Sequence, residues 1–220
     1  MSPRGARVPA RQAVSPGQID WDGACAHLQR VDRVMRKLIK AHGSARLQSR
    51  GDAFQTLARS IVGQQISVKA AQSVWDRLVG AVPEMVPAAV LDAGEDGLRG
   101  CGLSGRKVQY VLDLAGKFHA GEVHPEAWQS MPDDAVAGEL LSIRGIGRWT
   151  ADMFLIFHLM RPDVLPLGDL GLIKGVSQTY FAGEPVTQSE VREVAAAWAP
   201  WRSVGTWYIW RSLDPLPVEY

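Results

Sequence analysis

The chain has 220 residues, of which 46% are hydrophobic and 21% charged, and its formal net charge is +1. This length suits one sizeable domain or two small lobes that share a core, and the composition is that of a globular protein. No apolar run approaches the roughly 18 residues of a membrane-spanning helix, so we expect no membrane partner. The small net charge does not by itself indicate a nucleic-acid-binding protein.

Basic residues are concentrated near the N-terminus. Residues 1–50 hold ten Lys and Arg against three Asp and Glu, a local charge of +7 that leaves −6 for residues 51–220. A polyanion-binding segment and a solvated tail both account for this excess. Because no apolar stretch follows the first basic residues, we predict a flexible leader over residues 1–17 rather than a secretory signal. Cys25 and Cys101 are too few and too far apart for a metal cluster, which favours a reducing, intracellular location.

The first half of the chain shows apolar residues at helical spacing, interrupted by residue types that cap or break helices. The predicted helices are Trp21 to about Ala41, one capped by Asp52, one capped by Ser67, and Ser104 to Lys117, with Pro83 and Pro87 in a loop.

The second half shows the same periodicity and no period-two alternation long enough for a strand. The predicted helices here are Pro132 to Leu141, Arg148 to Met160, one opened by Asp169, Thr187 to Trp198, and Trp201 to Leu213. The predicted fold class is therefore all-α.

The segment Leu140–Ala151 (LLSIRGIGRWTA) predicts a helix, a tight turn and a second helix. Gly145 and Gly147 give the turn backbone freedom and leave room for close approach. The second helix begins with unpaired N–H groups and the positive end of its dipole, which together suit a phosphate oxygen. Such contacts position DNA without specifying its sequence. A Gly-x-Gly between helices is also typical of a plain tight turn.

The full string resembles the helix–hairpin–helix element of the DNA repair glycosylase superfamily, in which a Gly/Pro-rich loop and an aspartate follow the hairpin. The resemblance implies that backbone amides of the hairpin hold a phosphate of the damaged strand. It also implies a Na or K ion on hairpin carbonyls, with no other cofactor required. The expected residues are Gly145, Gly147, Thr150 and Arg148 for DNA, and the carbonyls of Leu141, Ile143 and Ile146 for the cation.

Asp169 lies 24 residues after Gly145 (169 − 145), beyond an apolar helix and a loop. Spacing by itself favours a simple helix N-cap. The resemblance implies instead that Asp169 is the catalytic carboxylate, which would stabilise positive charge on the sugar and orient the attacking water. The best-known bacterial alkylation-repair member has a second aspartate where this chain has Leu170. Asp163 and Asp152 are expected to be structural.

Several tryptophans indicate which class of substrate to expect. Superfamily members that also cut the DNA backbone have a lysine where this chain has Trp149, so the resemblance implies a monofunctional enzyme that leaves an abasic site. The string from Trp198 to Trp210 is similar to the C-terminal signature of the 3-methyladenine DNA glycosylase II family. Electron-rich rings attract a purine made cationic by methylation at N3 or N7. Trp149, Trp210 and Met153 are the expected pocket residues, although core packing is the ordinary role of any one tryptophan.

The stretch from Ile61 to Ala71 also looks like this family, in which its turn carries the side chain that fills the gap left by a flipped base. The matching residue is Gln65. Gln64 is an open alternative, and a plain turn capped by Ser67 is another.

Together these motifs cover roughly residues 20–215 and imply a two-lobed helical fold with the active-site cleft between the lobes and no N-terminal β domain. The helical domain is expected over 18–220, with lobe A at 18–50 and 165–220, and lobe B at 51–164 including the hairpin at 141–151. The expected function is excision of alkylated purines from double-stranded DNA by a monomeric enzyme of the bacterial cytoplasm, acting at the nucleoid. A glycosylase for oxidised or deaminated bases and a non-catalytic DNA-binding protein are the alternatives.

Overall fold

The computed structural model describes residues 18–43, 46–49 and 51–213, and these form eleven α-helices and no β-strand. The helices are α1 (Trp21–Val31), α2 (Arg33–His42), α3 (Ala53–Gly63), α4 (Val68–Ala81), α5 (Pro87–Gly100), α6 (Gly105–Ala120), α7 (Asp133–Leu141), α8 (Arg148–Phe157), α9 (Leu170–Tyr180), α10 (Gln188–Ala196) and α11 (Arg202–Leu213). The all-α prediction is confirmed. None of these helices is both long enough and apolar enough to cross a membrane. The leader predicted over residues 1–17 lies outside the described residues.

Side-chain caps set the start of several helices. The carboxylate of Asp52 accepts a hydrogen bond from the N–H of the third residue of α3. The hydroxyls of Ser67 and Ser104 do the same at α4 and α6. Each cap satisfies one of the four N–H groups that a helix leaves without an internal acceptor. These are the residues from which the sequence predicts the helix starts.

The single helix predicted from Trp21 to Ala41 is wrong, because the chain breaks at Asp32 between α1 and α2. Asp32 is extended (φ −135°, ψ 121°), and its Oδ1 accepts two N–H groups from the first turn of α2. Its Oδ2 accepts the Tyr180 hydroxyl at 2.7 Å and the Trp198 indole N–H at 3.1 Å. Both helices pack against one cluster of buried side chains, so the apolar periodicity continues across the break and conceals it.

The sequence does not predict helix α5, because Pro83 and Pro87 favour a loop here. Pro87 instead occupies the first turn of the helix, where its missing N–H costs little. Gly94 has φ 62° within the helix, and this kink interrupts the apolar repeat on which a helix prediction depends. Helix α8 also ends earlier than predicted, at Phe157, and Met160 beyond it has φ 55°.

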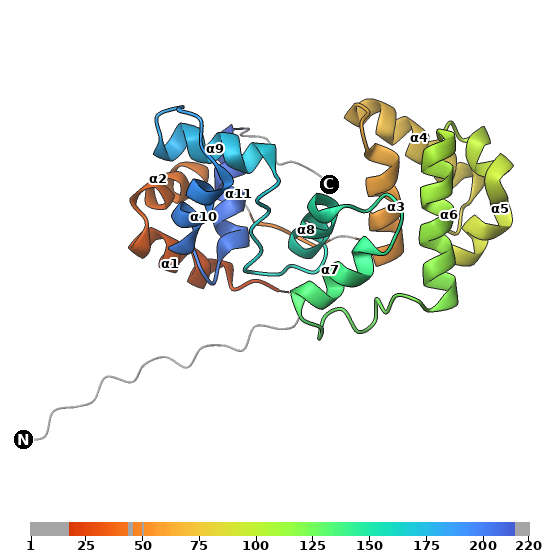
Figure 1. Ribbon diagram of the computed structural model, residues 1–220, viewed down its shortest axis with the longest axis horizontal. Coiled ribbons are helices and arrows are strands. Elements are labelled where there is room, and N and C mark those ends of the chain that lie inside the picture. The colour runs from red at the N-terminus through yellow and green to blue at the C-terminus, as the bar shows by residue number, and fades with distance from the viewer. Residues whose placement is uncertain (1–17, 44–45, 50, 214–220) are drawn as a thin grey trace, which may run out of the picture.

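Two hydrophobic clusters contain most of the buried hydrophobic residues. The larger cluster draws on α3 to α8, between Phe54 and Val164, and the smaller cluster draws on α1, α2 and α9 to α11. Figure 1 shows α3 to α6 on one side of the molecule, α1, α2 and α9 to α11 on the other, and α7 and α8 between them. The lobe limits given above stay a prediction, because the clusters are defined by packing and not by independent folding.

The loop between α8 and α9 leads from the larger cluster to the smaller, and the start of α11 holds it. Asp163 accepts hydrogen bonds from Nε and Nη2 of Arg202 at 2.7 and 2.8 Å. The hydroxyl of Ser203 accepts the N–H of Val164 at 2.9 Å. Asp163 therefore has a structural contact, and the loop that delivers Asp169 to α9 is anchored on α11.

Replacing Asp32 by alanine should lower the free energy of unfolding by about 3 kcal/mol, since it removes a helix cap and leaves two donors, on Tyr180 and Trp198, without their acceptor. Urea unfolding followed by circular dichroism measures the change. The control is Asp22→Ala, at an exposed carboxylate paired with Arg46, which should cost less than about 1 kcal/mol. Equal losses in the two variants would contradict the account of Asp32.

Candidate active site

Asp169 lies at the start of α9, and three N–H groups surround its carboxylate. Oδ1 accepts the backbone N–H of Leu172 at 2.6 Å and the indole N–H of Trp210 at 2.8 Å. Oδ2 accepts the indole N–H of Trp149 at 2.8 Å. The residue is 8% exposed. Asp169 is therefore an N-cap, as its spacing predicts, and also a buried acceptor for two tryptophans.

The donors to this carboxylate come from three helices. Trp149 lies in the first turn of α8, Leu172 lies in α9, and Trp210 lies near the end of α11. Trp210 also stacks on Phe157 of α8, with ring centroids 5.6 Å apart and an interplanar angle of 11°. Because α8 belongs to the larger cluster and α9 and α11 to the smaller, Asp169 lies where the two clusters meet.

Gly171 permits this close packing, and it is not among the residues that the sequence motifs indicate. A Cβ atom on Gly171 would lie 3.0 Å from Oδ1 of Asp169 and 3.3 Å from Cδ1 of Trp210. A side chain there would displace the carboxylate or the indole. The signal in the sequence was a glycine in the first turn of a helix, directly after the candidate aspartate and its neighbour.

Exposure differs among the side chains near the carboxylate. Trp149 is 39% exposed, and Leu170, which follows Asp169, is 80% exposed. Met153, one turn after Trp149, is 6% exposed and packs in the larger cluster. An indole and an apolar side chain therefore face solvent beside Asp169, while the place of Met153 in a substrate pocket stays a prediction.

The hairpin turn, residues 142–147, joins α7 to α8. Gly145 has φ 84°, and a Cβ atom there would overlap the ring of Tyr110. Gly147 is the N-cap of α8, and as a glycine it has no side chain that could accept an N–H group of the helix. The first three N–H groups of α8, those of residues 148–150, therefore have no acceptor within the helix and mark the positive end of its dipole.

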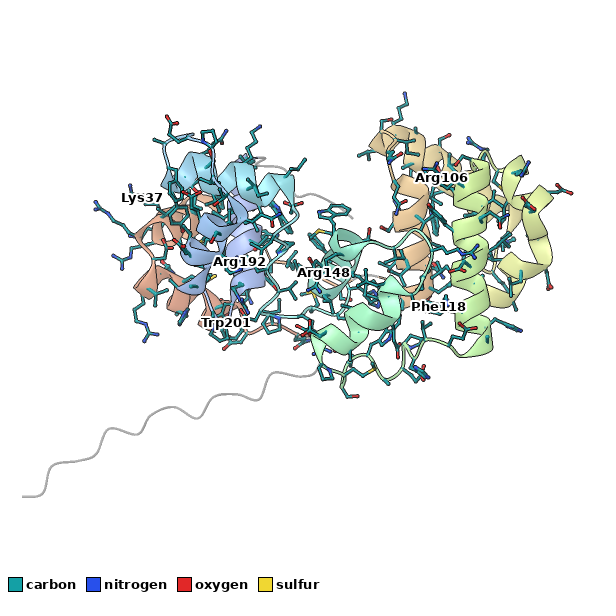
Figure 2. All side chains as sticks on the ribbon, viewed as in Figure 1. Lys37, Arg106, Phe118, Arg148, Arg192 and Trp201 are labelled. Atoms are coloured by element: carbon teal, nitrogen blue, oxygen red, sulfur yellow. The ribbon has the colours of Figure 1, made fainter. Side chains whose placement is uncertain are left out.

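Side chains around the hairpin hold its backbone in place. Nε of Arg148 donates to Oδ1 of Asp152 at 2.9 Å, and burial raises the pKa of Asp152. The backbone N–H of Arg144 donates to Oδ2 of Asp113 at 2.8 Å. Thr150 is buried, so the hairpin presents its backbone rather than this hydroxyl. Figure 2 shows Arg148 near the middle of the molecule, between the two groups of helices.

The turn that is predicted to carry the wedge residue, residues 64–67 and called the wedge turn below, joins α3 to α4. Gln65 is exposed and has φ 59°, a left-handed conformation that costs a non-glycine residue about 1 kcal/mol. Gln64 instead donates from Nε2 to the carbonyl of Gly145 at 2.8 Å. The turn thus contacts the hairpin through one glutamine and presents the other to solvent.

The carbonyls predicted to bind a cation lie at the end of α7 and in the hairpin turn. Leu141 is the last residue of α7, where carbonyls lack internal donors and the helix dipole is negative. The carbonyl of Ile143 accepts the N–H of Ile146 at 3.1 Å and keeps a second lone pair. Neutral carbonyls of this kind fit a monovalent cation. Within the described ranges, no three His, Cys, Asp or Glu side chains gather closely enough to hold a metal ion.

Comparison with known proteins gives consistent results. Residues 58–200 match the family described as HhH-GPD superfamily base excision DNA repair protein. DNA-3-methyladenine glycosylase 1 of Schizosaccharomyces pombe is 29% identical over 195 residues, which cover 84% of this chain and 85% of that protein. A DNA-3-methyladenine glycosidase from Bacillus halodurans superposes with a TM-score of 0.81 at 29% identity, over 90% of this chain and 91% of that one.

A second solved structure, the 3-methyladenine DNA glycosylase of Schizosaccharomyces pombe in complex with abasic DNA, superposes with a TM-score of 0.76 at 27% identity. The superposition covers 89% of this chain and 100% of that one. These similarities confirm the predicted helix–hairpin–helix glycosylase fold.

Gly145→Ala should lower the free energy of unfolding by about 2 to 4 kcal/mol, because the new Cβ would overlap Tyr110 at a φ that only glycine adopts easily. Gly147→Ala is the matched control, because φ there is −98° and a Cβ would meet nothing within 4 Å. Its cost should stay below about 1 kcal/mol. Urea unfolding of both variants measures the free energy of unfolding. An equal loss in Gly147→Ala would refute the packing argument.

Proposed function

The chain belongs to the HhH-GPD superfamily of base excision DNA repair proteins, and we propose that within it this protein is a monofunctional DNA glycosylase for alkylated purines. It flips an N3- or N7-methylated purine out of double-stranded DNA, hydrolyses the bond to the sugar and leaves an abasic site. The observation that carries the proposal is the buried carboxylate of Asp169, bound by two indole N–H groups next to the hairpin.

Backbone amides of the hairpin hold a phosphate of the damaged strand. The start of α8 supplies N–H groups that have no acceptor within the helix and the positive end of a dipole, and Gly147 leaves space for a phosphate to approach. We call these backbone amides at the start of α8 the phosphate clamp. The backbone of Trp149 is part of the clamp, and its indole N–H donates to the carboxylate of Asp169 at 2.8 Å. The sugar next to the bound phosphate therefore comes close to the carboxylate.

The reaction uses Asp169 for electrostatic stabilisation. As the N-glycosidic bond breaks, the electron pair leaves with the base and positive charge develops on the sugar. A carboxylate surrounded by N–H donors accepts hydrogen bonds in its ionised form, and in a partly buried site it stabilises that charge more strongly than water does. The same group orients the water that adds to the sugar.

The pocket is suited to a cationic base. Trp149 has an exposed indole, and Trp210 and Phe157 form a stacked pair of rings beside the carboxylate. Aromatic faces attract the positive charge of a methylated purine, which is also a good leaving group. Position 149 offers no amine for a Schiff base, so no strand cleavage follows base release.

Gln65 is the wedge that fills the gap left by the flipped base. It is exposed at the tip of the wedge turn in a left-handed conformation, whereas the side chain of Gln64 is bound to Gly145. Strained conformations of this kind concentrate at functional positions. The amide of Gln65 can also form hydrogen bonds with the base that loses its partner.

The carbonyls of Leu141, Ile143 and Ile146 are the proposed ligands of a Na or K ion. Such an ion would supply positive charge next to the bound phosphate, while the chain's own amides hold the phosphate in position. The monomeric state and the bacterial cytoplasmic location remain predictions.

Base release from DNA treated with a methylating agent tests the function directly. Chromatography should detect 3-methyladenine and 7-methylguanine in the supernatant, and the DNA should keep its backbone intact. Strong release of 8-oxoguanine without methylated purines would favour a glycosylase for oxidised bases. Binding of abasic DNA without release of any base would indicate a non-catalytic DNA-binding protein.

Asp169→Asn should reduce base release by about a thousandfold, because the amide cannot stabilise charge on the sugar. Binding to abasic DNA should change by less than about threefold, since the clamp is untouched. The control is Glu184→Gln, which neutralises an exposed carboxylate in the turn after α9. Wild-type activity in folded Asp169→Asn would show that Asp169 is not the catalytic group.

Gln65→Ala should slow excision from duplex DNA by about tenfold, since nothing then holds the gap open. The melting temperature should not fall, because the side chain is exposed and its left-handed backbone favours neither residue. Single-turnover kinetics and thermal unfolding measure the two quantities. An unchanged excision rate would remove Gln65 from this role.

A further inference from the structure

A chain of hydrogen bonds joins α6, the wedge turn and the hairpin turn. Nζ of Lys107, in the first turn of α6, donates to the carbonyls of Val62 and Gln64, at 2.7 Å each. The side-chain amide of Gln64 then donates to the carbonyl of Gly145 at 2.8 Å. Gln64 therefore lies between an ammonium group and the hairpin and is bonded to both.

Lys107 lies where α3 ends. The last carbonyls of a helix have no internal donors and form the negative end of its dipole. The ammonium group satisfies the carbonyl of Val62, in the last turn of α3, and that of Gln64, the residue that follows the helix. Burial lowers the pKa of Lys107. The side chain is thus held against the end of α3 in spite of the desolvation that this position costs.

The same helix supports the hairpin. Tyr110, one turn after Lys107, lies against Gly145, where a Cβ atom would overlap its ring. Asp113, a further turn along, accepts the backbone N–H of Arg144 at 2.8 Å. One side of α6 therefore touches the wedge turn near its start and the hairpin turn further along.

Packing beside Gln65 is sparse. A cavity of about 370 Å³ adjoins the wedge turn and is lined by Gln64, Gln65, Ser104, Arg106, Lys107 and Tyr110. Figure 2 shows Arg106 in the half of the molecule formed by α3 to α6. Glutamine seldom adopts φ 59°, and an open cavity does not enforce it. Gln64, the preceding residue, is bound through both its carbonyl and its side-chain amide.

We propose that Lys107 and Gln64 are positioning residues for base flipping, which hold Gln65 in its protruding conformation and tie the wedge turn to the hairpin turn. The wedge, Gln65, and the phosphate clamp at the start of α8 then contact the DNA in a fixed position relative to each other. This inference rests on the proposed function, in which Gln65 fills the gap left by the flipped base. Without these bonds the clamp still binds phosphate, but the wedge enters the base stack less often.

The test uses a DNA duplex with an abasic site opposite 2-aminopurine, whose fluorescence changes when a side chain enters the stack. Saturating wild-type protein should change the signal. Lys107→Met should reduce that change by about fivefold while Kd for the same DNA rises less than about threefold. Lys107→Arg, which keeps the donors, should restore most of the signal.

The matched control is Lys117→Met. Lys117 lies on the same helix but near its other end, where it pairs with Glu122 at 2.9 Å. This variant should give the wild-type signal and the wild-type Kd. If Lys107→Met does not fold, Gln64→Ala, which removes the bond to Gly145, should give the same loss of signal and carries the test.

Two results would overturn the proposal: no signal with wild-type protein, or an unchanged signal at saturation in the folded variants. An unchanged signal together with a weaker salt dependence of binding would make Lys107 a phosphate contact. The fluorescence measurement needs no base release. Wild-type protein that gives the signal but releases no methylated base would therefore overturn the proposed function and leave this inference standing.

Discussion

The carboxylate of Asp169 accepts hydrogen bonds from α8, α9 and α11, and the rest of the structure depends on this junction. A buried charge is costly unless its oxygens are satisfied, so the two tryptophans and the helix start are needed to keep it there. Because α8 packs in the larger cluster and α9 and α11 in the smaller, the group that we assign to catalysis also joins the two parts of the core.

A protein of net charge +1 can bind a polyanion if it uses fixed dipoles instead of many cations. The hairpin offers the positive end of the α8 dipole, and Gly145 lets the turn pack against Tyr110. Lys107, near both turns, bonds to protein carbonyls, and Arg148 bonds to Asp152. Positive groups near the proposed DNA surface therefore form bonds within the protein.

Much of the fold follows from local sequence. The caps at Asp52 and Ser67 appear as predicted, because each depends on a residue and the amide three positions later. The break at Asp32 was missed, because its stabilisation comes from Tyr180 and Trp198, which are distant in sequence. Helix α5 was missed because a proline and a kink disrupt its periodicity.

The candidate site also depends on contacts that local sequence does not predict. A glycine turn and an aspartate can be found along the chain, and resemblance to a known family adds the tryptophans. The three hydrogen bonds to Asp169, the space left by Gly171 and the bond from Gln64 to Gly145 depend on how distant segments meet.

The most direct measurement is a crystal structure of the protein with abasic DNA. Our account predicts the Asp169 carboxylate within about 4 Å of the sugar C1′, with hairpin amides on the adjacent phosphate. A carboxylate separated from that sugar by protein or by more than one nucleotide would contradict it.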